Sequence, residues 1–438
     1  MPWQVIPASE LISVKSLGAA EFTALMTSFR LTPGQKFALA VSGGPDSMAL
    51  AYCASRWARE HNFSAIAFIV DHGLRPESSA EAEETRKRLT VLGLQSEILR
   101  WDHAPVVTRL HASARKARYG LLTEACRRHS LIHLMLAHQR EDQAETILMR
   151  LAKGSGIDGL AGMRDQSVMD DVLLLRPLLN IPKERLVATC RAAKIDFIED
   201  ASNSSDKFAR GRLRKVMPLL AEEGLTLDRL IDLGNRAHDA KEALEYYTQV
   251  FLREASDRNA AGVIHMKMEK LQQLPRAIAT RALTLALQDV HKADYAPEYA
   301  SLTQLLQALL AGGEMAPRTL HGCLFSQTPK QITIMREFAA ITEAPRIRPG
   351  ESVVWDRRWH VTLADNVAGN FSIRPLGNPA HDMVDAFAPG LRRLVPQGRA
   401  RASLPALWDD GEGLVLIPRL HGSGPACARL VSSWPPEY

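Results

Sequence analysis

The sequence predicts an α/β protein whose N-terminal half is a Rossmann-like parallel sheet, followed by a helical domain and a small α+β C-terminal domain. Over the first 220 residues, short apolar runs alternate with amphipathic stretches, which is the pattern of a parallel sheet with helices on both faces. Residues 225–310 are rich in Ala and Leu and have few turn residues, which indicates helices. Beyond them, strand-like alternation returns, and Pro and Gly become frequent. We therefore expect domains at 1–222, 223–315 and 316–438.

Individual elements follow from the same periodicities. The strands expected in the first half are 36–41, 63–70, 94–99 and 131–137. Helices are expected between them at 47–60, 77–92 and 112–129. In the C-terminal domain, 319–336 and 353–363 alternate like strands. Ligands of parallel sheets bind at the carboxyl ends of the strands, so residues just after each strand are the candidates for a site.

The composition excludes several classes of protein. The chain has 438 residues, of which 46% are hydrophobic and 24% charged, as is ordinary for a globular protein of several domains. The longest apolar run, 131–137, contains His133 and is too short to cross a bilayer. The first residues lack the basic and then apolar pattern of a signal peptide. We expect a cytoplasmic protein that is neither secreted nor bound in a membrane.

Cysteines and charge add two further limits. The five cysteines are scattered without a CxxC pair: Cys53, Cys126, Cys190, Cys323 and Cys427. This pattern indicates reduced thiols rather than a disulfide framework or a zinc site. The net charge of +5 is too small to imply a polyanionic partner. Two basic stretches, 100–128 and 207–218, would attract phosphate, although solvated helix faces have the same composition.

A glycine-containing hexapeptide follows the first expected strand and opens the first expected helix. Its residues are Ser42, Gly43, Gly44, Pro45, Asp46 and Ser47. The glycine pair lets backbone amides approach a phosphate, and the serine hydroxyls and the helix N-terminus add donors and partial positive charge. The loop has no Lys, so it is not a GxxxxGK[ST] loop. A bridging Mg²⁺ explains a carboxylate in an anion-binding loop, which makes Asp46 the predicted metal ligand.

The hexapeptide resembles the pyrophosphate loop of the ATP pyrophosphatase (PP-loop, N-type) superfamily. Further motifs occur in order at 70–75, 114–119, 137–146, 154–160, 176–179, 199–203 and 208–214. This ordered set, over about residues 36–220, is similar to the tRNA(Ile)-lysidine synthetase family. The sequence departs from the family's common residues at Gln139, Glu141 and Gly211. The resemblance implies adenylation: an oxygen attacks the α-phosphate of ATP, pyrophosphate leaves, and a nucleophile then displaces AMP.

Two acids lie at the start of the helix that follows the fourth expected strand. Asp142 and Glu145 are spaced i, i+3, so their carboxylates share one face. Such a pair can hold an ammonium group and remove its proton, which a lysine amine with a pKa of about 10.4 requires before it can attack. The alternative is that both acids only complement the helix dipole. With the resemblance, we favour lysine binding.

Basic residues supply the remaining candidates. Arg115 and Arg118, also i, i+3, would neutralise the triphosphate or the leaving pyrophosphate, and Arg210 and Arg214 would contact phosphate of ATP or of the tRNA backbone. A solvated helix face is the alternative for both pairs. Three residues at strand ends complete the predicted ATP site: Val70, His72 and His138. His138 is equally well explained as a structural histidine.

The resemblance implies a ligase that joins free L-lysine to C2 of the wobble cytidine in an isoleucine tRNA with a CAU anticodon. The reaction would pass through an adenylated cytidine, release AMP and pyrophosphate, and give lysidine. Its catalytic residues would be Asp46, Arg115, Asp142 and Glu145, with ATP and Mg²⁺ required and no membrane involved; a homodimer stays open. The alternatives are a PP-loop tRNA thiolase, which the unpaired cysteines disfavour, and a non-catalytic module that binds nucleotide or RNA.

Overall fold

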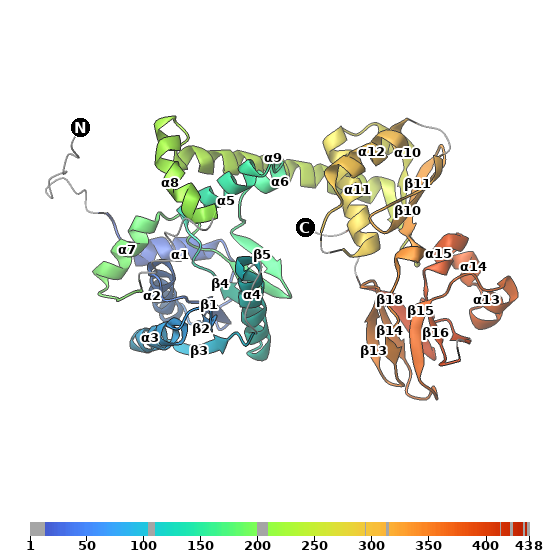
Figure 1. Cartoon of the computed structure of the whole chain (residues 1–438), viewed down its shortest axis with the longest axis horizontal. Coiled ribbons are helices and arrows are strands. Elements are labelled where there is room, and N and C mark those ends of the chain that lie inside the picture. The colour runs from blue at the N-terminus through green and yellow to red at the C-terminus, as the bar shows by residue number, and fades with distance from the viewer. Residues whose placement is uncertain are drawn as a thin grey trace. The chain divides into compact units, whose positions relative to one another are not determined.

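The computed structural model describes residues 14–103, 110–198, 209–293, 295–311, 315–411, 413–420, 424–431 and 434–435. The chain forms two compact units, Met1–Lys241 and Glu242–Tyr438 (Figure 1). The boundary between them falls within one long helix, α9 (Leu227–Ala255). The three domain ranges expected from the sequence stay predictions.

A six-stranded sheet forms the centre of the first unit, with strand order β3-β2-β1-β4-β6-β5. The strands are β1 (Lys36–Ala40), β2 (Ser64–Asp71), β3 (Gln95–Arg100), β4 (His133–Met135), β5 (Gln166–Met169) and β6 (Val172–Leu175). All neighbours are parallel except β5, which pairs antiparallel with β6. The predicted parallel sheet is therefore confirmed, with an antiparallel edge strand that the sequence did not indicate. Between β1 and β4 the chain order reverses, and a reversal of this kind opens a crevice at the carboxyl ends of the two strands.

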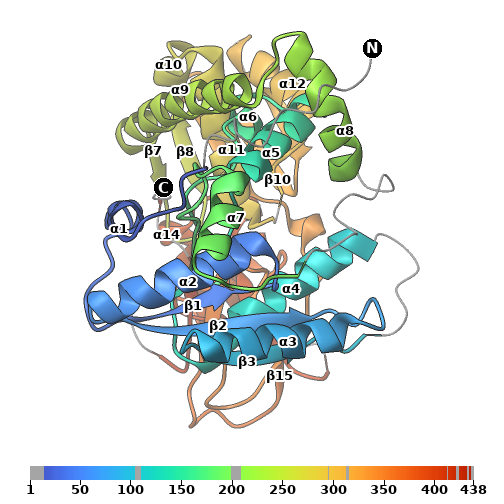
Figure 2. The ribbon, with the colours of Figure 1, turned by 90° about the vertical axis from the view of Figure 1, so that its left-hand side faces the viewer.

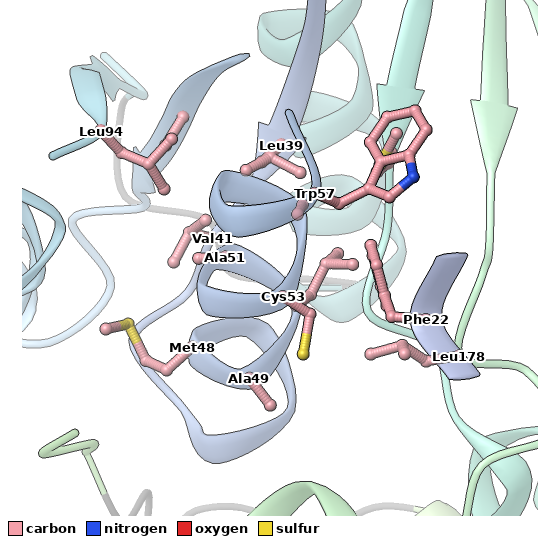
Figure 3. Close-up of a cluster of buried hydrophobic side chains, with 14 of the residues drawn as sticks. Phe22, Leu39, Val41, Met48, Ala49, Ala51, Cys53, Trp57, Leu94 and Leu178 are labelled. Carbon is pink, nitrogen blue, oxygen red and sulfur yellow. The ribbon is translucent and has the colours of Figure 1, made fainter. Parts of the chain in front are cut away.

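Helices cover both faces of this sheet. They are α1 (Ala19–Thr27), α2 (Pro45–Glu60), α3 (Ser78–Val91), α4 (Leu110–Arg128) and α7 (Lys183–Ala192). The first unit also contains α5 (Arg140–Ala152), α6 (Ile157–Leu160) and α8 (Ala209–Glu222). Phe37 and Leu39 of β1 pack in one core with α1, α2, α3 and α7, whereas Ala38 and Ala40 pack in another core with α4. Strand β1 is buried on both faces because its residues alternate between these two cores. Figure 2 shows α2 and α7 on the same side of the sheet, and Figure 3 shows Leu39 lying against α2.

A smaller apolar cluster joins three helices of the first unit. Ile147 and Leu148 of α5 are buried against Leu230 of α9, and Leu213 and Met217 of α8 pack on the same cluster. Because α8 is held against α5 in this way, its polar residues lie beside the start of α5.

The second unit contains three antiparallel sheets. The first has the order β7-β8-β11-β10-β9, formed by β7 (Ser256–Arg258), β8 (Ile264–Lys267), β9 (Met315–Leu320), β10 (Cys323–Gln327) and β11 (Gln331–Arg336). It packs with α9, α10 (Met268–Gln272), α11 (Arg276–His291) and α12 (Tyr299–Leu310) around one core. The helical stretch expected over 225–310 thus also contains β7 and β8, whose three and four residues are too few to give a period-two pattern.

The C-terminal residues form two more sheets around a core that includes Trp355, Trp359 and Leu407. One sheet has the order β12-β15-β16-β17, with β12 (Arg346–Ile347), β15 (Phe371–Pro375), β16 (Pro405–Trp408) and β17 (Leu414–Leu416). The other has the order β13-β14-β18, with β13 (Ser352–Trp355), β14 (Trp359–Leu363) and β18 (Ala426–Leu430). Short helices α13 (His381–Phe387), α14 (Leu391–Leu394) and α15 (Gly398–Ala402) complete this part. The predicted α+β class of this region is confirmed.

All five cysteines are free thiols, and all except Cys427 are buried. In the part of the chain that the structure describes, no helix combines the length and the apolar character that crossing a bilayer requires.

Candidate active site

The loop between β1 and α2 is shaped by its own hydroxyl groups. The Ser47 hydroxyl donates to the Gly44 carbonyl at 3.0 Å and accepts from the Ser42 amide at 3.2 Å. Gly43 has a φ of +84°, and a Cβ at this position would collide with the Thr85 hydroxyl and lie 2.9 Å from a methyl group of Ile198. Gly44 is the N-cap of α2. The first amides of α2 therefore have no carbonyl partners in the helix, which is the arrangement that binds anions.

Asp46 stands in the first turn of α2 with an unsatisfied carboxylate. Its Oδ1 is buried and accepts no hydrogen bond from the described residues. Burial raises the pKa of Asp46 to about 6; Lys183 and Arg214 oppose this shift, and the carboxylates of Asp142 and Glu141 add to it. No group of three His, Cys, Asp or Glu residues that could hold a metal ion occurs among the described residues. A lone carboxylate oxygen beside an anion-binding loop does fit Mg²⁺, which commonly takes one carboxylate together with phosphate oxygens and water.

The start of α5 is fixed by a capping box. The Gln139 side chain accepts hydrogen bonds from the amides of Glu141 and Asp142, and the Asp142 carboxylate accepts from the Gln139 amide at 3.3 Å. The departure from the family at Gln139 thus provides a working N-cap. The structural role that the sequence left open for Asp142 is present, and it fixes this carboxylate at the carboxyl edge of the sheet.

Glu141 connects the start of α5 to the start of α7. Its carboxylate oxygens accept from the backbone amide of Lys183 at 3.0 and 3.2 Å. The amide of Arg140 also donates to the carbonyl of Ile181 at 3.1 Å. These bonds bring Lys183 into electrostatic range of Asp46, where it is the strongest cationic influence on that carboxylate's pKa. Sequence reasoning missed Lys183; its only signal was a lysine at a helix start after β6.

Glu145 forms an ion pair with Arg214 of α8. The Glu145 side chain is only 4% exposed, and its two oxygens accept from Nε and Nη2 of Arg214, the latter at 3.3 Å. The hydrogen bond to Glu145 raises the pKa of Arg214. The sequence placed these residues in separate groups, one for lysine and one for phosphate. The structure brings them together.

The two arginines of α4 differ in their surroundings. The Arg115 guanidinium lies over the ring of Tyr119 at 5.1 Å and donates to its hydroxyl at 3.5 Å. Arg118 is exposed; desolvation lowers its pKa, and Tyr119 and the carboxylate of Asp142 oppose that shift. Arg118 therefore lies within electrostatic range of Asp142 at the start of α5.

The residues at the end of β2 and just after it have mainly structural contacts. Asp71 accepts from the Ser79 hydroxyl at 2.6 Å and from the Gly73 amide at 3.2 Å. Nδ1 of His72 accepts from the Leu74 amide at 3.1 Å, which fixes the loop that leads into α3. Val70 is half-buried in β2, next to the core under α4.

The last two candidates are His138 and Arg210. His138 is half-buried, three residues after the end of β4. The side chain of Arg210 and the motif at 199–203 lie outside the described residues.

Comparison with known proteins shows one family. The family of the PP-loop domain matches residues 17–220. The tRNA(Ile)-lysidine synthase of Anaplasma marginale is 33% identical over 341 residues, covering 77% of this chain and 73% of that protein. The enzyme of the same name from Bradyrhizobium diazoefficiens is 39% identical over 73% of this chain and 94% of its own length. That of Ruegeria pomeroyi is 32% identical over 94% of this chain and 93% of its own.

The resemblance that the motifs indicated is therefore confirmed, and it extends into the second unit. ATP is a substrate of PP-loop enzymes, which agrees with the loop at the start of α2. The chain belongs to the tRNA(Ile)-lysidine synthase family.

Proposed function

We propose that this protein joins free L-lysine to C2 of the wobble cytidine in a CAU-anticodon isoleucine tRNA, using ATP and giving lysidine. The observation that carries the proposal is the pairing of an anion-binding loop with acids across the β1–β4 crevice. Asp46 stands beside the loop in the first turn of α2, and the acids are Asp142 and Glu145 at the start of α5. Family membership supports lysine and isoleucine tRNA as the substrates, in preference to the substrates of other PP-loop enzymes.

The first half-reaction is adenylation of the tRNA base. O2 of the cytidine attacks the α-phosphorus of ATP, and the bond from that phosphorus to the bridging oxygen of pyrophosphate breaks. The amides of the first turn of α2 and the hydroxyls of Ser42 and Ser47 hold the phosphates, and Arg118 and Lys183 supply positive charge. Asp46 would hold Mg²⁺, which when bound supplies neutralising charge to the phosphate oxygens.

The second half-reaction is attack by lysine. Asp142 and Glu145 hold the substrate's ammonium group, and one of them takes the proton that the amine must lose before it can attack. The amine then forms the bond to C2, the C2–O2 bond breaks, and AMP leaves with that oxygen. The second proton leaves the nitrogen after the attack, so the base keeps only the single positive charge that it gained on adenylation.

The cysteines argue against the thiolase alternative. Burial raises the pKa of Cys53 and of Cys190 to about 12 and that of Cys126 to about 11. A thiol with such a pKa is almost never ionised at neutral pH and is a poor nucleophile. The reduced thiols also suit the cytoplasm, where we place the protein.

The test is lysine incorporation into defined tRNAs. The full chain is incubated with Mg²⁺, α-labelled ATP, labelled L-lysine and either isoleucine tRNA with a CAU anticodon or its methionine counterpart. We expect lysine to enter only the isoleucine tRNA, with one AMP released per lysine. AMP release without lysine incorporation contradicts the proposal in favour of another PP-loop reaction. The absence of any AMP indicates a module that only binds.

A further inference from the structure

Arg214 already occupies the Glu145 carboxylate, which is one of the two acids proposed to bind the substrate's ammonium group. Glu145 is 4% exposed, so its charge requires a cation close by. Both carboxylate oxygens accept hydrogen bonds from the same guanidinium, through Nε and Nη2. An ammonium group that approaches Glu145 therefore has to compete with Arg214 for the same two oxygens.

The guanidinium of Arg214 has a second binding position within reach, at the phosphate loop. Its side chain is about one-third exposed, whereas that of its partner is buried, so the guanidinium can move while Glu145 stays fixed. The charges of Asp46 and Arg214 act on each other, which places the guanidinium within electrostatic range of the phosphate loop. A guanidinium is planar and matches phosphate oxygens with two parallel N–H groups.

We propose that Arg214 is an internal substitute for the substrate's ammonium group, and that lysine replaces it on Glu145. The displaced guanidinium then binds a phosphate oxygen of ATP at the loop near Asp46. This proposal rests on the proposed function and adds a sequence of binding events to it. Buried Glu145 exchanges the guanidinium for the ammonium group and is paired with a cation throughout. The arginine that it releases completes the nucleotide site.

Positive coupling between lysine and nucleotide follows from the exchange. Nucleotide bound at the loop attracts Arg214 away from Glu145 and so removes the competitor of lysine. Lysine in turn releases Arg214 for the nucleotide, and the two effects on affinity are equal by thermodynamic linkage. The expected factor is about 10, in the usual range for coupled sites.

The experiment is calorimetric titration of the full chain with L-lysine, first alone and then with saturating Mg²⁺ and the α,β-methylene analogue of ATP. We expect the analogue to tighten lysine binding about 10-fold in the unmodified chain. In Arg214→Gln, lysine alone should bind about 10-fold more tightly than in the unmodified chain, and the analogue should add nothing further. Lys215→Gln, which removes the exposed neighbouring cation of α8, is the matched control and should keep the unmodified values.

Three results overturn the exchange: no coupling in the unmodified chain, coupling that persists in Arg214→Gln, or lysine binding that Arg214→Gln weakens. The first of these needs no variant, so it applies even if Arg214→Gln fails to fold. Arg214→Lys, which cannot form the fork, should then show reduced coupling.

Glu145→Gln separates this inference from the proposed function. Unchanged lysine binding in that variant means that lysine binds elsewhere and that the proposed lysine site is wrong. Loss of lysine binding in Glu145→Gln, together with normal coupling in Arg214→Gln, means that only the exchange is wrong.

Discussion

Two carboxylates at the same edge of the sheet have opposite surroundings. Asp46, in the first turn of α2, has a buried oxygen that no described donor reaches, and its pKa is raised to about 6. Glu145, in the first turns of α5, is more deeply buried but is held by a guanidinium. Among the described residues, a guanidinium thus binds Glu145 directly, whereas Lys183 and Arg214 influence Asp46 through their charges. We infer that Asp46 is kept for a cation that arrives with the nucleotide, whereas Glu145 is kept neutralised until its substrate arrives.

The largest expected effect comes from Asp46→Asn. If Asp46 holds the metal that accompanies ATP, lysine incorporation should fall at least about 100-fold. The same change should stabilise the chain in the absence of nucleotide by about 1–3 kcal/mol at pH 7, because it removes a carboxylate that the fold desolvates. Thermal unfolding and incorporation assays measure the two effects. Glu60→Gln, at the exposed end of α2, should change neither.

The pH dependence of that stabilisation has a defined sign. The pKa of Asp46 is about 6 in the folded chain, against 3.8 for an unperturbed aspartate, so the folded chain binds the proton more tightly than the unfolded chain. The cost of the ionised carboxylate is therefore full above pH 6 and disappears as the pH falls toward 4. The advantage of Asp46→Asn in free energy of unfolding should shrink over that range. An advantage that stays constant from pH 7 to pH 4 would show that it does not come from this carboxylate's ionisation.

The next effect concerns the two partners of the ion pair. Arg214→Gln leaves Glu145 buried without its cation and should lower the free energy of unfolding by about 3 kcal/mol. Glu145→Gln leaves Arg214, which can turn toward water, and should cost only about 1 kcal/mol. Urea denaturation of both variants measures this asymmetry, with Lys215→Gln as the control. Equal losses would mean that Glu145 reaches solvent when its partner is removed.

The sequence was most informative where a function lies in consecutive residues. The loop at 42–47 could be recognised because its glycines, serines and acid occupy one strand-to-helix junction. Strand β1 could be predicted because both of its faces are buried, which makes it a short apolar run, whereas β6 was not expected from the sequence. By contrast, β7 and β8 are too short to give a pattern, and they form a sheet only through pairing with β11.

The parts of the site that were missed depend on packing between distant segments. Glu145 and Arg214 are 69 residues apart, and only the apolar cluster shared by α5, α8 and α9 brings them together. Equal spacing on a helix was also a poor guide. Arg115 and Arg118 are i, i+3 on α4, yet one packs over Tyr119 while the other lies within range of Asp142.

The smallest expected effect concerns Lys183, which the sequence did not single out. The phosphate loop lacks the lysine of a GxxxxGK[ST] loop, and the bond from the Lys183 amide to Glu141 fixes a lysine of α7 beside the same crevice. Lys183→Met should raise the KM for ATP about 10-fold and leave the KM for lysine nearly unchanged, since the lost charge acts on Asp46 beside the phosphate loop. Arg191→Met, at the other end of α7, is the control. A larger rise in the KM for lysine than for ATP would show that Lys183 acts with the acids of α5 on lysine binding, and not with the phosphate loop on ATP binding.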